Sequence, residues 1–591
     1  MVDSRPVTEN KLALGVLAAL VLLNFCLVVP HADILGNLAV ARMVQGEGWG
    51  DFWTYGWLHR PLGYRLVLFG FVSWVEQWCS VRSVGGLVVF NATVAVFFFF
   101  LFWLSAGGAT RVRIGAHRIP LLPTSQPFYA WLGFLLVGQW LANQPEHYAA
   151  GFSLAMYFCF RHRGVPAVPH HILGALLFGL AFAQKYVTGI YLPMALAALI
   201  LVDKRSWKDL VWPMVWCAIS AVVVALALKR HPLEWQDTIT SSLIQVQVEG
   251  TGLKSLTRVG NLIKNLPIIA YFIPSLFVAI AMFPAVLHAR QGRDRVLFIS
   301  SWCFALVPLL MQSVGYSYHL TPLIAPALLT LRLAHLDGQV WGRSQWLTLS
   351  LSMGISAVGL WIPWIADEAR GPQAFAFCAT ALLVLFFARQ VTTARKATLT
   401  TCIGISSLWF MTEMDGHNTL DQNLSWADEM ANDYQLEGPG LLLAPASTVF
   451  QFSNTRSACR HTSPIPAQRF VLADRQIKEL LLADPGVREN LDCLRNFTGS
   501  WMLVNRKWFE AHKLSPEFYK GFKRVARHGS IEVWSRTPLV VPKMDWFKWL
   551  DEQEKDRSGA KQAKAKKQPK AKKHSKVETV TSKKAKATTE P

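Results

Sequence analysis

Long apolar segments recur along the first two thirds of the chain, separated by shorter polar connections. Most of them approach the roughly 20 residues that an α-helix needs to cross a bilayer. No Ala-x-Ala cleavage site follows the first segment, so we expect that segment to be a retained helix. We predict a mainly α-helical polytopic membrane protein with about thirteen transmembrane helices, near residues 12–29, 84–104, 127–142, 146–160, 170–185, 187–202, 209–228, 266–288, 296–313, 318–335, 346–365, 373–389 and 397–413.

Lysine and arginine residues are concentrated in alternate connections between these segments. Arg5 and Lys11 precede the first helix, and the predicted topology puts five basic connections on the same side: TRVRIGAHR, RHRG, DKRSWK, HARQGRDR and RQVTTARK. Such an excess of positive charge is typical of cytoplasmic loops. We therefore predict a multi-pass protein of the plasma (inner) membrane with a cytoplasmic N-terminus. The odd number of helices places the C-terminal part on the extracytoplasmic side.

Two outer connections are longer than the others. Residues 30–83 and 229–265 are predicted to be outer loops of a transmembrane catalytic domain that covers residues 1–413. Within the first loop, GNLAVARMVQGEGWGDFW has apolar residues at roughly helical spacing, which predicts a helix lying in the membrane interface. A plain connector would be shorter than residues 229–265, so the second loop favours a role in admitting substrate from the lipid.

The composition changes after residue 413 to that of a small water-exposed domain. LLLAP, WMLVN and IEVWS are predicted strands, and RQIKELLLA and the region around RKWFEAHK are predicted helices. This alternation indicates an α/β extracytoplasmic domain over residues 414–541. Its only cysteines, Cys459 and Cys493, are a candidate disulfide pair in an oxidising compartment. Residues 542–591 form a Lys- and Ala-rich tail that we expect to be disordered.

Composition agrees with a membrane protein, since 52% of the residues are hydrophobic, 16% are charged and the mean hydropathy is +0.27. The formal net charge of +21 owes a large share to the tail. Because the tail is predicted to lie outside the cell, we expect it to meet anionic lipid headgroups or envelope polymers and expect no nucleic-acid partner.

Ionisable and aromatic residues gather beside the outer ends of the predicted helices, where they are costly unless they are used. Each also has an ordinary explanation: an acid after a helix can be a loop carboxylate, a terminal lysine can extend to water, and tyrosines are common at membrane interfaces. The candidate site residues are Asp33, Asp51, Arg60, Glu146, Lys185, Tyr318 and His319.

The order of these motifs resembles the membrane glycosyltransferases of the GT-C fold. It is most similar to the dolichyl-phosphate-mannose–protein mannosyltransferases and the bacterial lipid A aminoarabinose transferase. Asp33 matches the family acid after the first helix, and HRPLGY places Arg60 where the family has the lysine of K-P-P-L. GLAFAQKYVTGIYLP with Lys185 matches the family's G-L-A-x-x-x-K-G run, and YHLTPLIAP matches its tyrosine–proline segment. Departures are the single acid at Asp33 and a glutamate, Glu146, as the acid of the fourth helix.

The resemblance implies an inverting transferase that moves a sugar from a polyprenyl-phosphate donor to a lipid, glycan or protein of the cell envelope. Asp33 would act as the general base. Arg60 and Lys185, together with Tyr318 or His319, would bind the donor phosphate and its growing charge. Asp51 and Glu146 would be supporting acids, and membrane lipids would surround the enzyme.

Three questions stay open at the level of sequence. A divalent metal beside Asp33 and Glu146 is one option, although no ligand cluster has metal-binding spacing. A polytopic transporter or flippase for a lipid-linked glycan is the main alternative function. It is disfavoured because no internal repeat is found and the polar residues gather at one face. An envelope scaffold is a third reading, and it leaves the acids and bases unexplained.

Overall fold

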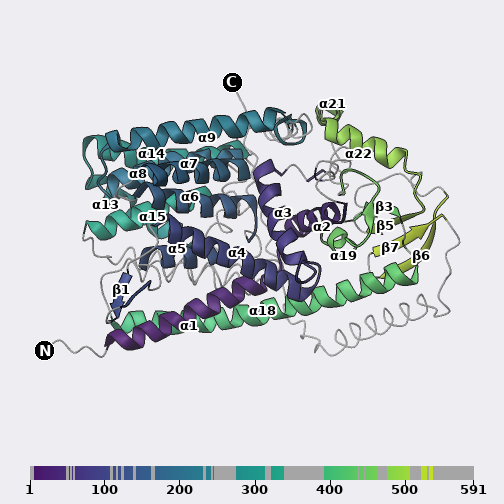
Figure 1. The fold of residues 1–591 in the computed structure, drawn as a ribbon, viewed down its shortest axis with the longest axis horizontal. Coiled ribbons are helices and arrows are strands. Elements are labelled where there is room, and N and C mark those ends of the chain that lie inside the picture. Colours follow the sequence, from purple (N-terminus) through teal and green to yellow (C-terminus); the bar gives the residue numbers. More distant parts are fainter. Residues whose placement is uncertain are drawn as a thin grey trace, which may run out of the picture.

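The computed structural model describes most of the helical part and the core of the C-terminal part (Figure 1). The described residues are 6–47, 52, 56–57, 60–106, 111–114, 117–120, 125–136, 142–161, 167–230, 235–240, 244, 274–312, 321–337, 392–434, 436, 438–444, 446–462, 475–505, 521–528 and 531–536.

The protein is mostly helical. Eleven of the thirteen predicted apolar segments coincide with helices, and the other two, 346–365 and 373–389, lie outside the described residues. The longer helices are α1 (Pro6–Leu27), α2 (Ala32–Glu47), α3 (Leu62–Glu76), α4 (Val84–Ser105), α5 (Ser125–Leu135), α6 (Pro145–Arg161), α7 (Ala167–Gln184), α8 (Tyr191–Leu201), α9 (Val211–Arg230), α13 (Pro274–His288), α14 (Gly292–Gln312), α15 (Thr321–Leu336) and α18 (Thr392–Asp433).

Two helical stretches among the described residues are long and apolar enough to cross a membrane: Val84–Ser105 and Trp207–Arg230. The second joins the short helix η3 (Trp207–Leu210) to α9. A third is obtained if Gly15–Leu27 and Ala32–Gln45, which meet at a bend of 63°, are counted as one broken span. The figure of thirteen transmembrane helices therefore stays a prediction.

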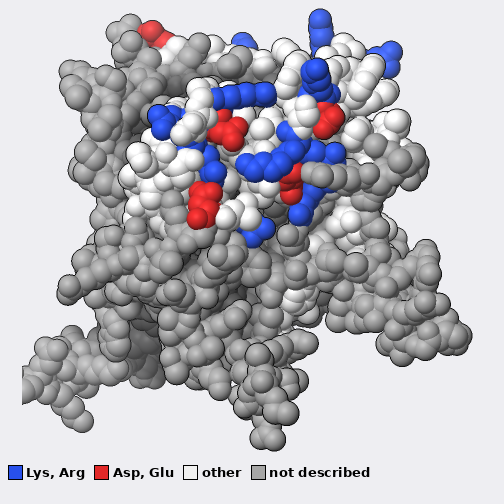
Figure 2. Space-filling model, turned by 90° about the vertical axis from the view of Figure 1, so that its left-hand side faces the viewer, with Lys and Arg blue, Asp and Glu red and all other residues white. Residues whose placement is uncertain are grey.

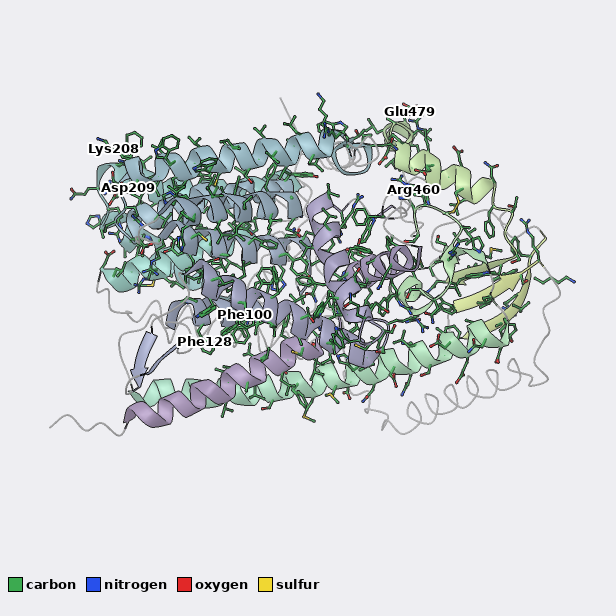
Figure 3. The ribbon with its side chains drawn as sticks, viewed as in Figure 1. Phe100, Phe128, Lys208, Asp209, Arg460 and Glu479 are labelled. Carbon is green, nitrogen blue, oxygen red and sulfur yellow. A yellow bond between two sulfur atoms is a disulfide. The ribbon has the colours of Figure 1, made fainter. Side chains whose placement is uncertain are left out.

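Helices α6 to α9 and α13 to α15 lie roughly parallel in one bundle (Figure 1). Lys, Arg, Asp and Glu side chains gather on the face at one end of this bundle (Figure 2). Two ion pairs at the helix ends contribute to it, Arg161–Asp203 at 2.8 Å and Arg290–Asp337 at 2.7 Å. Three of the five basic connections begin or end beside these helix ends. Lys208 and Asp209 also lie at this end, whereas Arg460 and Glu479 lie at the opposite side of the molecule (Figure 3).

The long helix α18, which leads into the C-terminal part, differs from the expectation. The sequence predicts an apolar segment ending at residue 413 and a separate domain from residue 414, but α18 is one unbroken helix of 42 residues from Thr392 to Asp433. At 1.5 Å per residue it is about 60 Å long, roughly twice the thickness of a bilayer core. The polar composition after residue 413 therefore marks a change of surroundings along a single helix. A glycine with a φ of +73°, Gly438, follows the helix and opens the C-terminal sheet.

The C-terminal part contains a mixed sheet of five strands in the order β4-β3-β5-β7-β6. Strand β3 runs parallel to β4 and β5, while β7 is antiparallel to β5 and β6. Its strands are β3 (Pro439–Leu443), β4 (Arg456–Ser457), β5 (Trp501–Asn505), β6 (Lys523–His528) and β7 (Ile531–Ser535), and its helices are α19 (Ala446–Gln451), α21 (Arg475–Leu482) and α22 (Pro485–Arg495).

The strands predicted at LLLAP, WMLVN and IEVWS are confirmed, as is the helix at RQIKELLLA. The region around RKWFEAHK lies outside the described residues. Strand β6 was not predicted, because its sequence KRVARH is dominated by basic residues and carries little apolar signal. It is held by backbone pairing with β7 in a hairpin at the edge of the sheet.

Cys459 and Cys493 form a disulfide with a Cα–Cα distance of 5.8 Å. Cys459 follows β4 and Cys493 lies in α22, so the bond ties this helix to the edge of the sheet. The core beneath it is apolar and includes Leu441, Leu443 and Leu491.

We expect neither Cys459 nor Cys493 to react with a maleimide until a reductant is added. A membrane-impermeant maleimide applied to intact cells, in a Cys79→Ser background, measures this together with the outside location of the domain. The matched control is Cys459→Ser, which frees the less buried Cys493 and should label without reductant. Labelling of both cysteines in the unreduced protein would contradict the disulfide, and no labelling of reduced intact cells would contradict the topology.

Candidate active site

Asp33 lies at the start of a helix, not in a loop as expected. It is in the first turn of α2, where the N–H groups of Ile34 and Leu35 both donate to the carbonyl of His31, at 2.8 and 3.1 Å. A carboxylate is favourable there because the N-terminal end of a helix carries partial positive charge. The Asp33 backbone N–H donates to Nδ1 of His31 over 3.3 Å. Its side chain remains 35% exposed, so it can be reached from outside the fold.

Arg60 is the cationic partner of Asp33. Its Nη2 lies 3.4 Å from the Asp33 carboxylate oxygen Oδ2, and its side chain is 16% exposed. Pro61 is the N-cap residue of α3, and the Arg60 carbonyl accepts a hydrogen bond of 2.6 Å from Nε of Arg65. Arg65 is itself only 2% exposed. A buried arginine thus fixes the backbone from which Arg60 extends, although the surrounding PLGYRLVLF gave no hint of this role.

Glu146 and Lys185 form a second ion pair. Glu146 is in the first turn of α6, and Lys185 stands between the end of α7 and the short helix η2 (Tyr186–Ile190). The lysine Nζ donates directly to Oε1 of Glu146. Glu146 is 5% exposed and Lys185 is 22% exposed, so the acid is shielded and the base borders on solvent. A buried carboxylate needs such a charged partner.

A close helix contact brings the two ion pairs together. Gly63 in α3 packs so tightly against the end of α7 that a Cβ on it would lie 2.5 Å from the Cβ of Ala183. Small residues allow this approach. Arg60 precedes Gly63 by three residues and Lys185 follows Ala183 by two, so the contact sets both cations in one region. Only a glycine at position 63 permits it.

Tyr64 is close enough to both ion pairs for their charges to act on its phenol. Burial raises the pKa of Tyr64 well above its ordinary value, and the charges of Arg60, Glu146 and Asp33 all act on it, the arginine lowering and the acids raising it. One cation and both carboxylates therefore lie within electrostatic range of this one phenol, which indicates that the two ion pairs are near each other. Its hydroxyl donates to the carbonyl of Asn143 over 3.0 Å. Sequence reasoning missed Tyr64 because it stands in an apolar helix.

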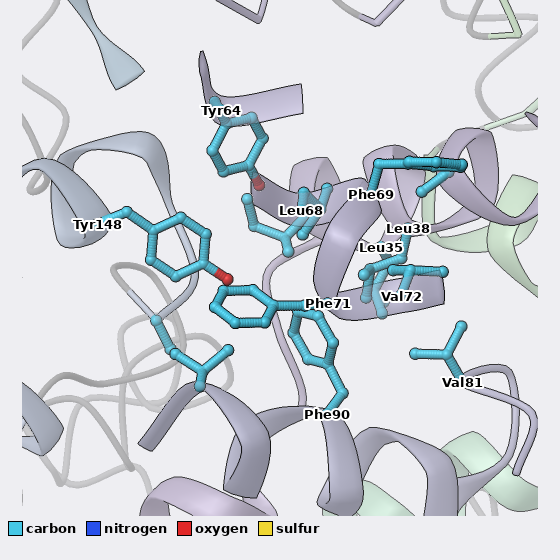
Figure 4. Packing of buried hydrophobic residues seen from close by; sticks show 14 of the residues in the cluster. Leu35, Leu38, Tyr64, Leu68, Phe69, Phe71, Val72, Val81, Phe90 and Tyr148 are labelled. Carbon is cyan, nitrogen blue, oxygen red and sulfur yellow. The ribbon is translucent and has the colours of Figure 1, made fainter. Parts of the chain in front are cut away.

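A buried network of hydrogen bonds holds Tyr64 and the start of α6 in place. Asn143, whose φ is +62°, accepts at its side-chain oxygen from the Tyr148 hydroxyl over 3.2 Å. An asparagine tolerates this left-handed conformation better than most residues. The ring of Tyr148 packs against those of Tyr64 and Phe71, and Phe71 packs against Phe90 in the surrounding apolar core (Figure 4). The network therefore sits in a dry environment, where satisfied hydrogen bonds are strongly ordering.

Asn91 of α4 joins this network to the end of α1. Its Nδ2 donates to the carbonyls of Cys26 and Val28, at 3.0 and 2.8 Å, and its oxygen accepts from Nδ2 of Asn143 over 2.8 Å. The carbonyls at the end of a helix have no partner within it. Asn91 thus fixes the turn that leads from α1 to Asp33.

We expect Asn91→Leu to lower the stability of the protein by about 3 kcal/mol, because each buried group left unpaired costs roughly 1–3 kcal/mol. Thermal unfolding in detergent measures this. Thr93→Val is the control on the same helix, since the Thr93 hydroxyl bonds only the Val89 carbonyl of its own helix. Equal melting temperatures for the two variants would contradict the role given to Asn91.

The long helix α18 also holds this turn. Glu413 accepts at Oε2 from the N–H of Val29 over 3.3 Å, and Nε2 of His417 bonds the carbonyl of Leu27. Both side chains are buried. Glu413 and His417 straddle the domain boundary expected from the sequence, yet they act together on the turn before Asp33.

The C-terminal part contacts the segment that precedes Arg60. The N–H of Gly56 donates to the carbonyl of Arg460 over 2.8 Å, and a Cβ on Gly56 would lie 2.3 Å from the ring of His461. Arg82 adds a second contact through the Gln451 carbonyl and a 2.7 Å ion pair with Asp428. The segment carrying Arg60 is thus packed against the strand region beside the disulfide.

The remaining predicted site residues, Asp51, Tyr318 and His319, lie outside the described residues. Their roles stay predictions. Within the part of the chain that the structure describes, no group of three or more His, Cys, Asp or Glu side chains could hold a metal ion. The described geometry brings together Asp33, Arg60, Glu146 and Lys185.

Comparison with known proteins finds similar solved structures, including the following two. The apo structure of ArnT from Cupriavidus metallidurans is 16% identical, with a TM-score of 0.45, and the match covers 90% of this chain and 98% of that one. The oligosaccharyltransferase AglB from Archaeoglobus fulgidus, in complex with an inhibitory peptide and a dolichol-phosphate, is 11% identical, with a TM-score of 0.35 over 91% of this chain and 75% of that one. No family model and no curated protein matches the sequence.

Proposed function

We propose that this protein is a membrane glycosyltransferase that moves a sugar from a polyprenyl-phosphate donor to a cell-envelope acceptor, with inversion at the anomeric carbon. The observation that carries the proposal is the convergence of two acid–base pairs, Asp33–Arg60 and Glu146–Lys185, across the contact between α3 and α7. It supplies one accessible carboxylate and two cations that border on solvent.

Asp33 is the proposed general base. The acceptor oxygen attacks the anomeric carbon, its proton passes to the Asp33 carboxylate, and the bond from that carbon to the phosphate oxygen breaks. The lipid monophosphate leaves with the electron pair of that bond. Before the donor arrives, Arg60 neutralises Asp33, and its 3.4 Å contact is loose for an ion pair. An arriving phosphate competes for the arginine and so frees the carboxylate to take a proton.

Arg60 and Lys185 are the proposed cations for the leaving phosphate. Negative charge grows on the phosphate as the bond breaks, and cations already in place stabilise it with little reorganisation. Tyr318 or His319 is proposed to donate a hydrogen bond to the same group, and Asp51 to act as a supporting acid. Glu146 holds the lysine in position while the site is empty of donor.

The proposed topology has thirteen spans, a cytoplasmic N-terminus, outer loops at residues 30–83 and 229–265, and an extracytoplasmic domain over residues 414–541 in a plasma (inner) membrane. The charged end of the bundle in Figure 2 supports this orientation, because basic helix ends favour the cytoplasmic side. The acid–base pairs lie at the opposite helix ends, where a lipid-linked donor carries its sugar.

The test is turnover by the purified protein in nanodiscs, using radiolabelled polyprenyl-phosphate sugars and lipid or glycan acceptors extracted from the envelope. Release of the carrier lipid coupled to labelling of the acceptor is expected. Transbilayer movement of the donor in proteoliposomes, without transfer to any acceptor, would instead establish the flippase alternative.

A further inference from the structure

Two glutamines lie beside the Glu146–Lys185 pair, and their side chains form no hydrogen bond to any described residue. Gln144 and Gln184 are both fully buried, at 0% exposure, and within the described part of the chain neither the oxygen nor the nitrogen of either amide has a hydrogen-bond partner. Buried polar groups are nearly always bonded, so two wholly unpaired amides at one place call for an explanation.

The backbones of these glutamines take part in the helices, in contrast to their side chains. The carbonyl of Gln144 accepts from the N–H groups of His147 and Tyr148, at 3.0 and 3.2 Å, which starts α6. Gln184 is the last residue of α7. The fold therefore requires a residue at each position but does not require an amide.

The two glutamines share one end of the helix bundle. Helix α6 begins next to Gln144 and α7 ends at Gln184, and these two helices pack against each other along their length. The ion pair between Glu146 and Lys185 fixes the two helix ends together. Gln144 and Gln184 each stand within two residues of that pair.

Tyr191 adds a third unpaired group to the same place. It is 6% exposed, its hydroxyl has no partner, and the charge of Glu146 acts on it. Tyr191 begins α8, so the three polar groups lie at the ends of three different helices: just before α6, at the end of α7 and at the start of α8. Together they border the ion pair whose lysine is the proposed phosphate ligand.

The chemistry of these groups selects the ligand. A glutamine amide has two donor hydrogens and an acceptor oxygen, and a phenol both donates and accepts. Phosphate only accepts hydrogen bonds, so it could not pair with the two amide oxygens. A neutral molecule with several hydroxyl groups fits amides and a phenol, because each hydroxyl donates and accepts as they do.

We infer that Gln144, Gln184 and Tyr191 form a subsite that binds the hydroxyl groups of the donor's sugar, beside the phosphate held by Arg60 and Lys185. This inference rests on the function proposed above. The amides are left unpaired in the free protein because their partners arrive with the donor, and they would select among sugars by the positions of the hydroxyls.

The test compares binding of two kinds of probe to purified protein: bare polyprenyl phosphate, and polyprenyl phosphates that carry a hexose, an N-acetylhexosamine or an aminopentose. The wild-type protein should bind at least one sugar-bearing lipid more tightly than the bare lipid. Gln144→Leu and Gln184→Leu should weaken that binding by about 10- to 100-fold, while affinity for bare polyprenyl phosphate stays unchanged.

Stability separates this effect from misfolding. Leucine is similar to glutamine in volume and removes an unpaired buried amide, so the melting temperature of the free variants should be unchanged or higher. Tyr191→Phe removes only a hydroxyl and should weaken sugar-dependent binding by about fivefold to tenfold without unfolding. The matched control is Gln451→Leu in α19, a buried amide whose oxygen also lacks a partner but which lies away from the pair. It should leave binding of both probes unchanged.

Equal binding of bare and sugar-bearing lipids by the wild-type protein would overturn the subsite. So would glutamine variants that bind every probe as the wild type does, since the amides would then hold buried water only. Sugar-dependent binding that is lost in the variants, with no transfer to any acceptor, would overturn the proposed transferase function and leave the subsite standing.

Discussion

We expect Asp33→Asn to lower kcat by roughly 10²–10⁴-fold while expression and donor binding stay close to those of the wild type. Asparagine keeps the shape of the side chain but cannot take up the acceptor's proton, and general-base catalysis contributes a factor of this size. The Asp33–Arg60 pair is partly exposed, so its loss should cost no more than about 1 kcal/mol of stability. Initial rates with saturating donor measure the effect.

The matched control is Asp337→Asn. Asp337 also forms a partly exposed ion pair, with Arg290, but directly after the C-terminal end of α15. The Asp337→Asn enzyme should transfer sugar at the wild-type rate. An Asp33→Asn enzyme with most of its activity would remove Asp33 from the role of base, leaving a carboxylate that merely begins a helix.

The second large effect is expected from the cations. Arg60→Ala and Lys185→Ala should each lower kcat by about 10²–10³-fold and raise KM for the donor, because a cation at the leaving phosphate acts most strongly as charge develops. The two variants should differ in stability. Lys185→Ala strands the buried Glu146, which costs about 3–5 kcal/mol, whereas Arg60→Ala leaves the more exposed Asp33 in contact with water.

A double variant separates these two losses. Glu146→Gln with Lys185→Met removes both charges, so it should regain most of the melting temperature that Lys185→Ala loses while activity stays low. Arg60→Lys should be the mildest change, because it keeps the positive charge. Lys185→Arg should be harsher, since a planar guanidinium must fit where an ammonium bonds Glu146. Wild-type donor kinetics in both alanine variants would contradict the proposed phosphate site.

Local patterns in the sequence were sufficient to predict most helices. Apolar runs such as residues 84–104 are long and uniform, and the structure has α4 there within one residue. The strands WMLVN and IEVWS were equally clear, since they are short, apolar and bounded by polar residues. Where the length and hydrophobic pattern of a segment are clear, its secondary structure can be predicted from the residues of that segment alone.

The site depends on contacts that no local pattern records. Arg60 and Asp33 are 27 residues apart and Lys185 and Glu146 are 39 apart, so their pairing follows from how α2, α3, α6 and α7 pack. The contact of Gly63 with Ala183 decides which polar residues meet. The sequence around a glycine in an apolar helix does not show which helix will pack against it. The sequence could supply the candidates, and only the packing could choose the partners.

The continuity of α18 determines where this protein can be recombined with a relative. A chimera joined at residues 413 and 414, where composition changes, would cut the helix between the turn contacts made by Glu413 and His417. Such a hybrid would inherit each half of the support for Asp33 from a different parent. A junction near Gly438, beyond the last turn of the helix, keeps that support whole and transplants the sheet as a unit.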